Sequence, residues 1–252
     1  MTKPLLRTHR LTKRFGGVTA TDALDFEVAQ GEVHAVIGPN GAGKTTLVGQ
    51  LIGELFPDDG QIVFADRDIT KLPSFRRALL GMSRSYQVTS IFAEFTVLEN
   101  VAIAAQAHLG HSFGFWRPAN GEDALIRPAR RVLDEVGLSD KCSRIAAELA
   151  HGERRQLEIC MALVSTPKLL LLDEPMAGMG RGESESIVRL LAALKGRYTI
   201  VLVEHDMDAV FALADRITVL VYGRQIACGK PHEIRSNVEV RKAYLGDRNA
   251  AR

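Results

Sequence analysis

A glycine-rich segment carries the clearest chemical signal in the chain. It matches the pattern G-x-x-x-x-G-K-[ST] and consists of Gly38, Pro39, Asn40, Gly41, Ala42, Gly43, Lys44, Thr45 and Thr46. In this pattern backbone N–H groups surround phosphate oxygens, and glycines let the backbone come within hydrogen-bond distance of the ligand. An apolar run at 33–37 precedes the segment, and a helix-like run ends at Ile52. The spacing predicts a strand, a phosphate-binding loop and a helix whose N-terminus favours anions. An incidental glycine-rich turn is the alternative.

Further residues have the types that phosphoryl transfer requires. Lys44 is predicted to bridge the β- and γ-phosphates, and the Thr45 hydroxyl to bind Mg²⁺. Asp173 and Glu174 end an apolar run of four leucines, so Asp173 is expected on the metal side and Glu174 as the general base that polarises water. An acidic pair that merely ends a strand at the surface is the alternative. Phe15 precedes a Gly-Gly turn and is interpreted as an adenine-stacking ring rather than a strand-end hydrophobe.

Composition excludes several classes of protein. The chain has 252 residues, 46% hydrophobic and 25% charged, and a formal net charge of +2, which is typical of a globular protein and gives no electrostatic case for nucleic acid. Cys142, Cys160 and Cys228 lack metal-binding spacing and favour a reducing compartment. The first ten residues do not resemble a signal peptide, and no run of about 18 apolar residues occurs. We therefore expect neither secretion nor a membrane span, although docking on a membrane is open.

Short apolar runs alternate with amphipathic segments at both ends of the chain. This alternation predicts a parallel sheet covered on both faces. Strands are expected at 5–11, 24–28, 33–37, 61–64, 82–86, 169–172, 199–203, 217–222 and 225–228, and helices at 45–52, 76–80, 183–195, 206–214 and 239–245. From 88 to about 166 apolar residues recur with the period of a helix, which indicates a helical insertion. Within it, the aromatic segment Phe113 to Trp116 is compatible with a buried hairpin tip or an exposed docking surface.

The segment Leu149-Ala150-His151-Gly152-Glu153-Arg154-Arg155-Gln156 resembles the signature motif of the ATP-binding cassette (ABC) ATPases. Gln87 resembles their Q-loop glutamine, and His205 resembles their switch histidine. Phe15 matches their adenine-stacking aromatic. Together with the two nucleotide motifs, these motifs follow the order and spacing of the family and extend over nearly the whole chain.

The resemblance implies an α/β P-loop fold with a mostly parallel sheet core, an N-terminal antiparallel β part and a helical subdomain. A single ABC ATPase domain is expected over 1–252, with 1–87 and 167–252 as the nucleotide-binding core and 88–166 as the helical signature subdomain. The implied cofactors are ATP and Mg²⁺. The residues Ala150, His151, Gly152 and Glu153 would bind the nucleotide of a second ABC ATPase subunit, identical or different, through the following helix N-terminus.

Two of the site residues have structural alternatives. His205 is interpreted as the residue that holds the γ-phosphate and water, although a histidine at a strand end is often an ordinary polar residue. Gln87 could be a simple strand cap, but at the border of the helical block it can reach the metal and move with the insertion.

The chain departs from the usual family pattern in three places, two in the signature-like segment and one after the acidic pair. Ala150 stands in place of serine, which removes a hydroxyl whose bond to a charged group would contribute about 1.5–3 kcal/mol. His151 replaces a glycine and Glu153 a glutamine. Gly180 stands where an aspartate is usual, so the contribution of that carboxylate to coupling between two sites is in question. These departures predict weak self-association with ATP and a different partner cassette.

Other segments narrow the resemblance within the family. They resemble the ATPase subunits of bacterial branched-chain amino acid importers, and the related urea and short-chain amide importers share much of the pattern. The segments are 15–17, 84–87, 95–101, 174–179 and 240–246. This implies a peripheral subunit on the cytoplasmic face of the inner membrane, with two transmembrane permeases and, indirectly, a periplasmic solute-binding protein. A cassette that acts on nucleic acid or ribosomes and a nucleotide-sensing module are the alternatives.

Overall fold

The computed structural model describes residues 3–85, 91–109 and 120–249. Its strands form two sheets. The first is antiparallel, in the order β2-β1-β4-β5, and comprises β1 (Pro4–Phe15), β2 (Val18–Ala29), β4 (Asp59–Phe64) and β5 (Arg67–Asp68). The second, in the order β10-β9-β3-β8-β7-β6, comprises β3 (Val33–Ile37), β6 (Met82–Ser85), β7 (Leu169–Asp173), β8 (Thr199–Val203), β9 (Arg216–Val221) and β10 (Arg224–Gly229). All neighbouring pairs in the second sheet are parallel except β9 and β10.

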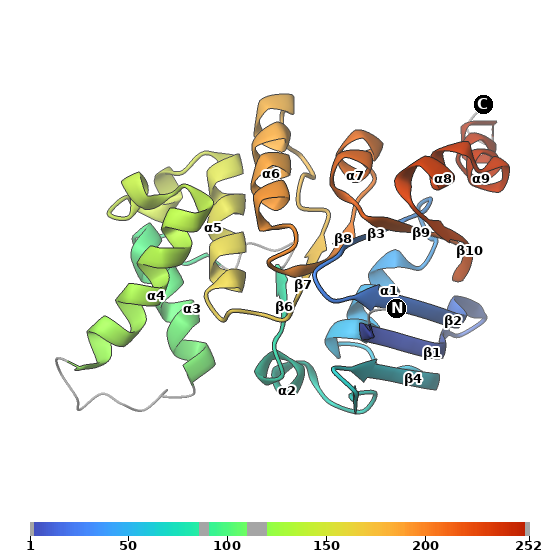
Figure 1. The fold of residues 1–252 in the computed structure, drawn as a ribbon, viewed down its shortest axis with the longest axis horizontal. Helices are drawn as coiled ribbons and strands as arrows, with labels where there is room; N and C mark the ends of the chain where they lie inside the picture. The colour runs from blue at the N-terminus through green and yellow to red at the C-terminus, as the bar shows by residue number, and fades with distance from the viewer. Residues whose placement is uncertain (1–2, 86–90, 110–119, 250–252) are drawn as a thin grey trace.

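One group of helices lies at one end of the molecule, and the other helices lie along and around the sheets (Figure 1). A group beside β6 and β7 contains α3 (Val97–Leu109), α4 (Asn120–Val136), α5 (His151–Leu163) and the 3-10 turns at Ser139–Lys141 and Ala146–Glu148. The others are α1 (Lys44–Ile52), α2 (Ser74–Leu79), α6 (Arg181–Leu194), α7 (Met207–Leu213), α8 (Pro231–Ser236) and α9 (Val238–Asn249). No helix in the described ranges is long and apolar enough to cross a membrane.

Alternating side chains of β7 supply two separate cores. Leu169 and Leu171 pack with α1 and the first sheet, whereas Leu170 and Leu172 pack with α4, α5 and α6. All four are at most 1% exposed. The helix after the glycine-rich loop is therefore held between the two sheets, while the helical group shares a continuous core with the opposite face of the parallel sheet.

The predicted α/β architecture with its mostly parallel sheet is confirmed, and the differences lie at element ends. β1 and β2 run to 12 residues each, well beyond 5–11 and 24–28, because their outer ends carry polar side chains that weaken the apolar pattern. α2 and α6 each begin two residues before their predicted starts at 76 and 183. The short elements β5 and α8 were not predicted, and the Phe113 to Trp116 segment lies outside the described residues.

Candidate functional site

The carboxyl ends of three neighbouring parallel strands bring the predicted site residues together. Gly38 follows β3, Glu204 follows β8, and Glu174 follows β7. The register pairs Val36 with Val203 and Val203 with Asp173, so these ends meet at one edge of the sheet. Ligands in open α/β sheets bind outside this edge. Gln87 lies outside the described residues.

The glycine-rich loop needs glycine for steric reasons as well as for ligand access. Gly43 has φ of +101°, and a Cβ there would lie 2.1 Å from the Ala20 carbonyl oxygen. A Cβ on Gly38 would lie 2.2 Å from the Leu220 carbonyl oxygen. Gly41 has φ of +77° but would meet nothing within 4 Å, so this part of the loop is open to a ligand. The N–H of Ala42 donates to Pro39 within the loop.

Lys44 folds back over the loop. Its Nζ donates to the carbonyl oxygens of Gly38 at 2.7 Å and Pro39 at 3.1 Å, and the residue is 8% exposed. Burial lowers the pKa of Lys44, and the charges of Glu174 and Asp173 act in the opposite direction. Lys44 is the first residue of α1, so its ammonium lies where the positive end of the helix also favours an anion. Of the other loop residues, Asn40 and Thr45 are exposed, and Thr46 is half-buried.

The two carboxylates after β7 have different environments. Asp173 is 1% exposed and accepts from Arg84 Nη2 at 3.0 Å; burial raises its pKa, while the Arg84 charge lowers it. Glu174 is partly exposed and has φ of +48°, a conformation that strains a non-glycine residue. Its N–H donates to Val203 at 2.8 Å, which holds it beside β8. A partly exposed carboxylate next to a buried one is compatible with the predicted roles of Glu174 as general base and Asp173 on the metal side.

His205 and Glu174 face one another across a short gap. His205 Nδ1 lies 3.9 Å from Glu174 Oε1, and the His205 side chain is 64% exposed. Glu204, 1% exposed, supports both: it accepts from the Met176 N–H at 2.9 Å and from the His205 N–H at 3.0 Å. The gap between imidazole and carboxylate opens to solvent, so both groups can reach a water molecule.

The signature-like residues begin α5 on the other face of the parallel sheet from α1 (Figure 1). Ala150 is the N-cap and provides no side-chain hydrogen bond. Glu153 accepts from the Ala150 N–H at 3.0 Å and pairs with Lys141, whose hydrogen bond lowers the pKa of Glu153. His151 is exposed, and Gly152 is partly buried. These residues are therefore not brought to Lys44 of their own chain.

Phe15 ends β1 and is 48% exposed. Lys13 Nζ lies 5.7 Å from its ring centroid. The glycine-rich loop is next to the neighbouring strand, since Gly43 approaches the Ala20 carbonyl of β2. The ring thus has an uncovered surface on the same side of the molecule as the loop.

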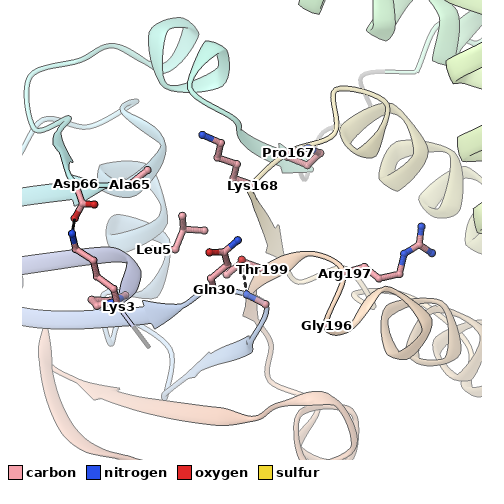
Figure 2. Close-up of a pocket in the computed structure, with 12 residues that line it drawn as sticks. Lys3, Leu5, Gln30, Ala65, Asp66, Pro167, Lys168, Gly196, Arg197 and Thr199 are labelled. Atoms are coloured by element: carbon pink, nitrogen blue, oxygen red, sulfur yellow. Dashed lines mark hydrogen bonds and ion pairs between the residues drawn. The ribbon is translucent and has the colours of Figure 1, made fainter. Parts of the chain in front are cut away.

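A cavity away from the glycine-rich loop does not have the charge distribution of a phosphate site. A cavity of about 510 Å³ lies at the amino ends of β7 and β8, the edge opposite the glycine-rich loop, and is lined by Gln30, Lys168 and Thr199 among others. Figure 2 shows that its cationic side chains do not converge: Lys168 and Arg197 point away from one another. Lys3 is paired with Asp66 at 2.8 Å. This cavity therefore lacks the focused positive charge that a polyphosphate requires.

Comparison with known proteins accounts for this geometry. A family model described as "ABC transporter" matches residues 21–177, and one described as "Branched-chain amino acid ATP-binding cassette transporter" matches 224–250. The chain belongs to the ABC transporter family. It is 38% identical to the high-affinity branched-chain amino acid transport ATP-binding protein BraF of Pseudomonas aeruginosa, over 98% of this chain and all of BraF. It is 39% identical to LivG of Escherichia coli K12 with the same coverage.

Solved ABC structures have the same fold. The ADP conformation of MJ1267, an ATP-binding cassette of an ABC transporter, superposes with a TM-score of 0.86 at 32% identity, covering 97% of this chain and 100% of MJ1267. A nucleotide-free cassette gives 0.84 at 31% identity, covering 96% and 99%. As a member of this family the chain is an ATP-binding cassette that hydrolyses ATP in support of transport.

Sequence reasoning did not single out two arginines of this ABC cassette. Arg84 links Asp173 to Glu54, whose carboxylate it contacts at 2.6 Å. Arg155, on α5, donates to the carbonyl oxygens of Pro175 at 3.1 Å and of Asp173 and Glu174 at 3.2 Å. Arg155 lies within the signature-like segment, and this position could have marked it as a functional residue. Its contacts could not be predicted, because they depend on how α5 packs against the end of β7.

Proposed function

We propose that this chain is the ATP-hydrolysing subunit of an importer for branched-chain amino acids and acts at the cytoplasmic face of the membrane. The observation that carries the proposal is full-length identity of 38–39% with relatives named as branched-chain amino acid transport ATP-binding proteins. The match of residues 224–250 to the branched-chain amino acid cassette model supports it independently of the nucleotide motifs.

The arrangement at the sheet edge supports a different role for each residue of the proposed site. Lys44 and the loop N–H groups bind the phosphates, and a nucleotide phosphate would replace the Gly38 and Pro39 carbonyls as partners of the ammonium. The Phe15 ring stacks on adenine. Glu174 accepts a proton from the attacking water, and His205, at 3.9 Å from Glu174, holds the water and the γ-phosphate. Glu204 positions both by fixing the backbone around them.

The donor set is compatible with Mg²⁺, which prefers oxygen ligands and retains several waters when bound with nucleotide phosphates. Thr45 and Asp173 supply a hydroxyl and a carboxylate, and Gln87 an amide oxygen. The described residues contain no group of three or more His, Cys, Asp or Glu side chains that could hold a metal ion. When bound, the ion would neutralise charge on the phosphates. The hydrogen bond from Arg84 holds the Asp173 carboxylate in position at this site.

A second cassette is needed to complete the proposed site. The position of α5 and α1 on opposite faces of the parallel sheet supports a role for Ala150, His151, Gly152 and Glu153 toward a nucleotide bound by another subunit. The proposed domain organisation follows from this division, with 1–87 and 167–252 as the nucleotide-binding core and 88–166 as the helical signature subdomain of one ABC ATPase domain.

A groove between β6 and the helical group is a candidate contact for the permeases. A cavity of about 240 Å³ is lined by Ser83, Arg84, Ser85, Ala104, Ala107, Glu158, Met161 and Ala162. These residues come from β6 and from α3 and α5 of the helical group. A permease segment bound there would touch both the core and the helical group, and a solute-binding protein would act through the permeases.

Two variants test the ATPase assignment. Glu174→Gln removes the general base and should lower the ATP turnover number by about 10²- to 10⁴-fold while ATP binding is retained. Lys44→Ala should abolish ATP binding or turnover. Near wild-type hydrolysis by Glu174→Gln would show that another group is the base, and unchanged ATP affinity of Lys44→Ala would remove the lysine from the phosphate site.

The transport assignment is tested in the assembled transporter. The chain is purified with its co-expressed permeases and second cassette, reconstituted in vesicles, and assayed for ATP-dependent uptake of leucine, isoleucine, urea and acetamide. We expect uptake and solute-stimulated turnover with leucine and isoleucine. Stimulation by urea or acetamide alone would assign the chain to the related amide importers, and turnover without membrane partners that no solute changes would favour a sensing module.

A further inference from the structure

The Glu183 side chain joins the first turns of two helices. Its Oε1 accepts from the Gly152 N–H of α5 at 2.9 Å, and its Oε2 accepts from the Gly180 N–H before α6 at 3.2 Å. The approach is close, since a Cβ on Gly152 would lie 3.2 Å from both Cβ and Cγ of Glu183. The hydrogen bond from Gly152 is the first cause of a lowered pKa at Glu183, so the group is an anion at neutral pH.

This contact uses a donor that the proposed function needs elsewhere. Gly152 belongs to the helix end that would meet the γ-phosphate held by a partner cassette, and its N–H carries a single hydrogen. A carboxylate and a phosphate at the same donor would also repel each other. One anion must therefore move before the other can bind in the same place.

We propose that Glu183 is a positioning residue that holds the Gly152 N–H in the nucleotide-free chain and releases it when the γ-phosphate of a partner-bound ATP arrives. The inference rests on the proposed two-cassette site. Glu183 acts through Gly152 and the α5 N-terminus, and it does not touch the reacting atoms. Its consequence is a threshold: the ATP concentration that drives association of two cassettes is higher than it would be without this carboxylate.

Helix capping alone is the simpler explanation of Glu183, and the chain contains a matched comparison. In α6 and in α8 a glutamate at the third position accepts from the N-cap N–H, Glu183 from Gly180 and Glu233 from Lys230, the latter at 2.7 Å. Glu183 differs because its second oxygen accepts from another helix. Glu183→Gln leaves one acceptor oxygen for two N–H donors and removes the charge, while Glu233→Gln makes the same chemical change at a helix remote from α5.

The experiment compares both variants in a Glu174→Gln background, which keeps bound ATP intact. The first measurement is amide exchange of Gly152 in the isolated chain, followed by NMR on protein labelled with ¹⁵N-glycine. Exchange should become faster in Glu183→Gln and stay unchanged in Glu233→Gln. The second is ATP-dependent self-association by sedimentation equilibrium. The ATP concentration for half-maximal association should fall about fivefold in Glu183→Gln, equivalent to one favourable charge interaction at a helix end.

Each outcome has a defined meaning. Equal or weaker association of Glu183→Gln, with faster Gly152 exchange, would show that Glu183 only caps helices and would overturn the inference. If neither protein associates with itself, the same titration is made with the co-expressed second cassette, and an ATP threshold that Glu183→Gln does not lower there would overturn the inference. ATP binding by the same samples, lost in Lys44→Ala, reports separately on the proposed function. Thermal unfolding of both variants checks that Glu183→Gln and Glu233→Gln lower stability by similar amounts through the loss of helix capping.

Discussion

Gly43 and Gly41 separate two reasons for glycine in the phosphate-binding loop. Both have positive φ, but a Cβ on Gly43 would collide with the Ala20 carbonyl oxygen, whereas a Cβ on Gly41 meets open space. We predict that Gly43→Ala lowers the free energy of unfolding by about 3 kcal/mol, through strain and forced movement of β2. Gly41→Ala should lower the free energy of unfolding by only about 1 kcal/mol, because it adds backbone strain without a steric collision. Urea titrations of the two variants measure the difference, and equal losses would contradict the packing argument.

Cys228 is the residue whose chemistry the nucleotide motifs do not explain. Its Sγ accepts from Thr218 at 3.4 Å and from Arg216 at 3.5 Å, and Thr218 contacts the buried His34. Partial desolvation raises the thiol pKa, but hydrogen bonds from His34, Thr218 and Arg216 outweigh it and bring the pKa of Cys228 to about 6. The thiolate should therefore predominate at neutral pH.

We predict that iodoacetamide alkylates Cys228 with a rate midpoint near pH 6, while burial, which raises the pKa of Cys160, protects that thiol. Arg216→Gln removes one donor and one charge, so the midpoint should move upward toward the value of an ordinary thiol. Mass spectrometry of alkylated peptides over pH 5 to 9 gives both curves. A midpoint that Arg216→Gln leaves unchanged would show that the guanidinium does not stabilise the thiolate.

At the scale of elements, Arg77 fastens α2 to the carboxyl end of α1. It is 0% exposed and donates to the carbonyl oxygens of Gln50 at 2.6 Å and Leu51 at 2.8 Å, as well as those of Thr70 and Leu72. Burial lowers its pKa to about 10, so it stays charged at neutral pH. A cation at this helix end complements the helix dipole and donates to carbonyls of the last helical turn.

We predict that Arg77→Met lowers the free energy of unfolding by about 3–5 kcal/mol, because four carbonyl oxygens each lose the hydrogen bond from Arg77 in a buried place. Arg76→Met is the matched control. The Arg76 side chain is exposed, so this substitution should change the free energy of unfolding by less than about 0.5 kcal/mol. Thermal and urea unfolding provide the comparison. Similar losses in the two variants would mean that the buried hydrogen bonds contribute little.

The same scale shows what sequence could predict. The run of leucines at 169–172 and the loop after 37 were placed correctly because a fully buried parallel strand and a phosphate-binding loop leave direct patterns in the sequence. The positions of Arg77, Arg84 and Arg155 could not be predicted, since an arginine's partners are backbone carbonyls or carboxylates that only tertiary packing brings near. Glu204 was passed over for the same reason: its acceptor role depends on the turn after β7.

For the whole molecule, one core joins the helical group to the nucleotide-binding sheet. Buried residues of α3, α4 and α5 pack in the same cluster as Leu170, Leu172 and α6. Arg155 adds a polar connection, because this side chain of α5 binds three successive carbonyl oxygens around Glu174. We therefore expect a displacement of α5 to move the backbone that carries the proposed general base through Arg155, without passing through the glycine-rich loop.

We predict that Arg155→Lys, which keeps the charge but loses the planar fork, lowers the ATP turnover number more than it raises the KM for ATP, because Lys44 and its loop are untouched. Arg181→Lys on α6 is the matched control, since the Arg181 side chain is 95% exposed. Steady-state ATPase assays on the assembled transporter separate the two parameters, and circular dichroism checks folding. A rise in KM with an unchanged turnover number would show that Arg155 supports nucleotide binding rather than the placement of Glu174, and the connection from α5 to the base would then have no catalytic role.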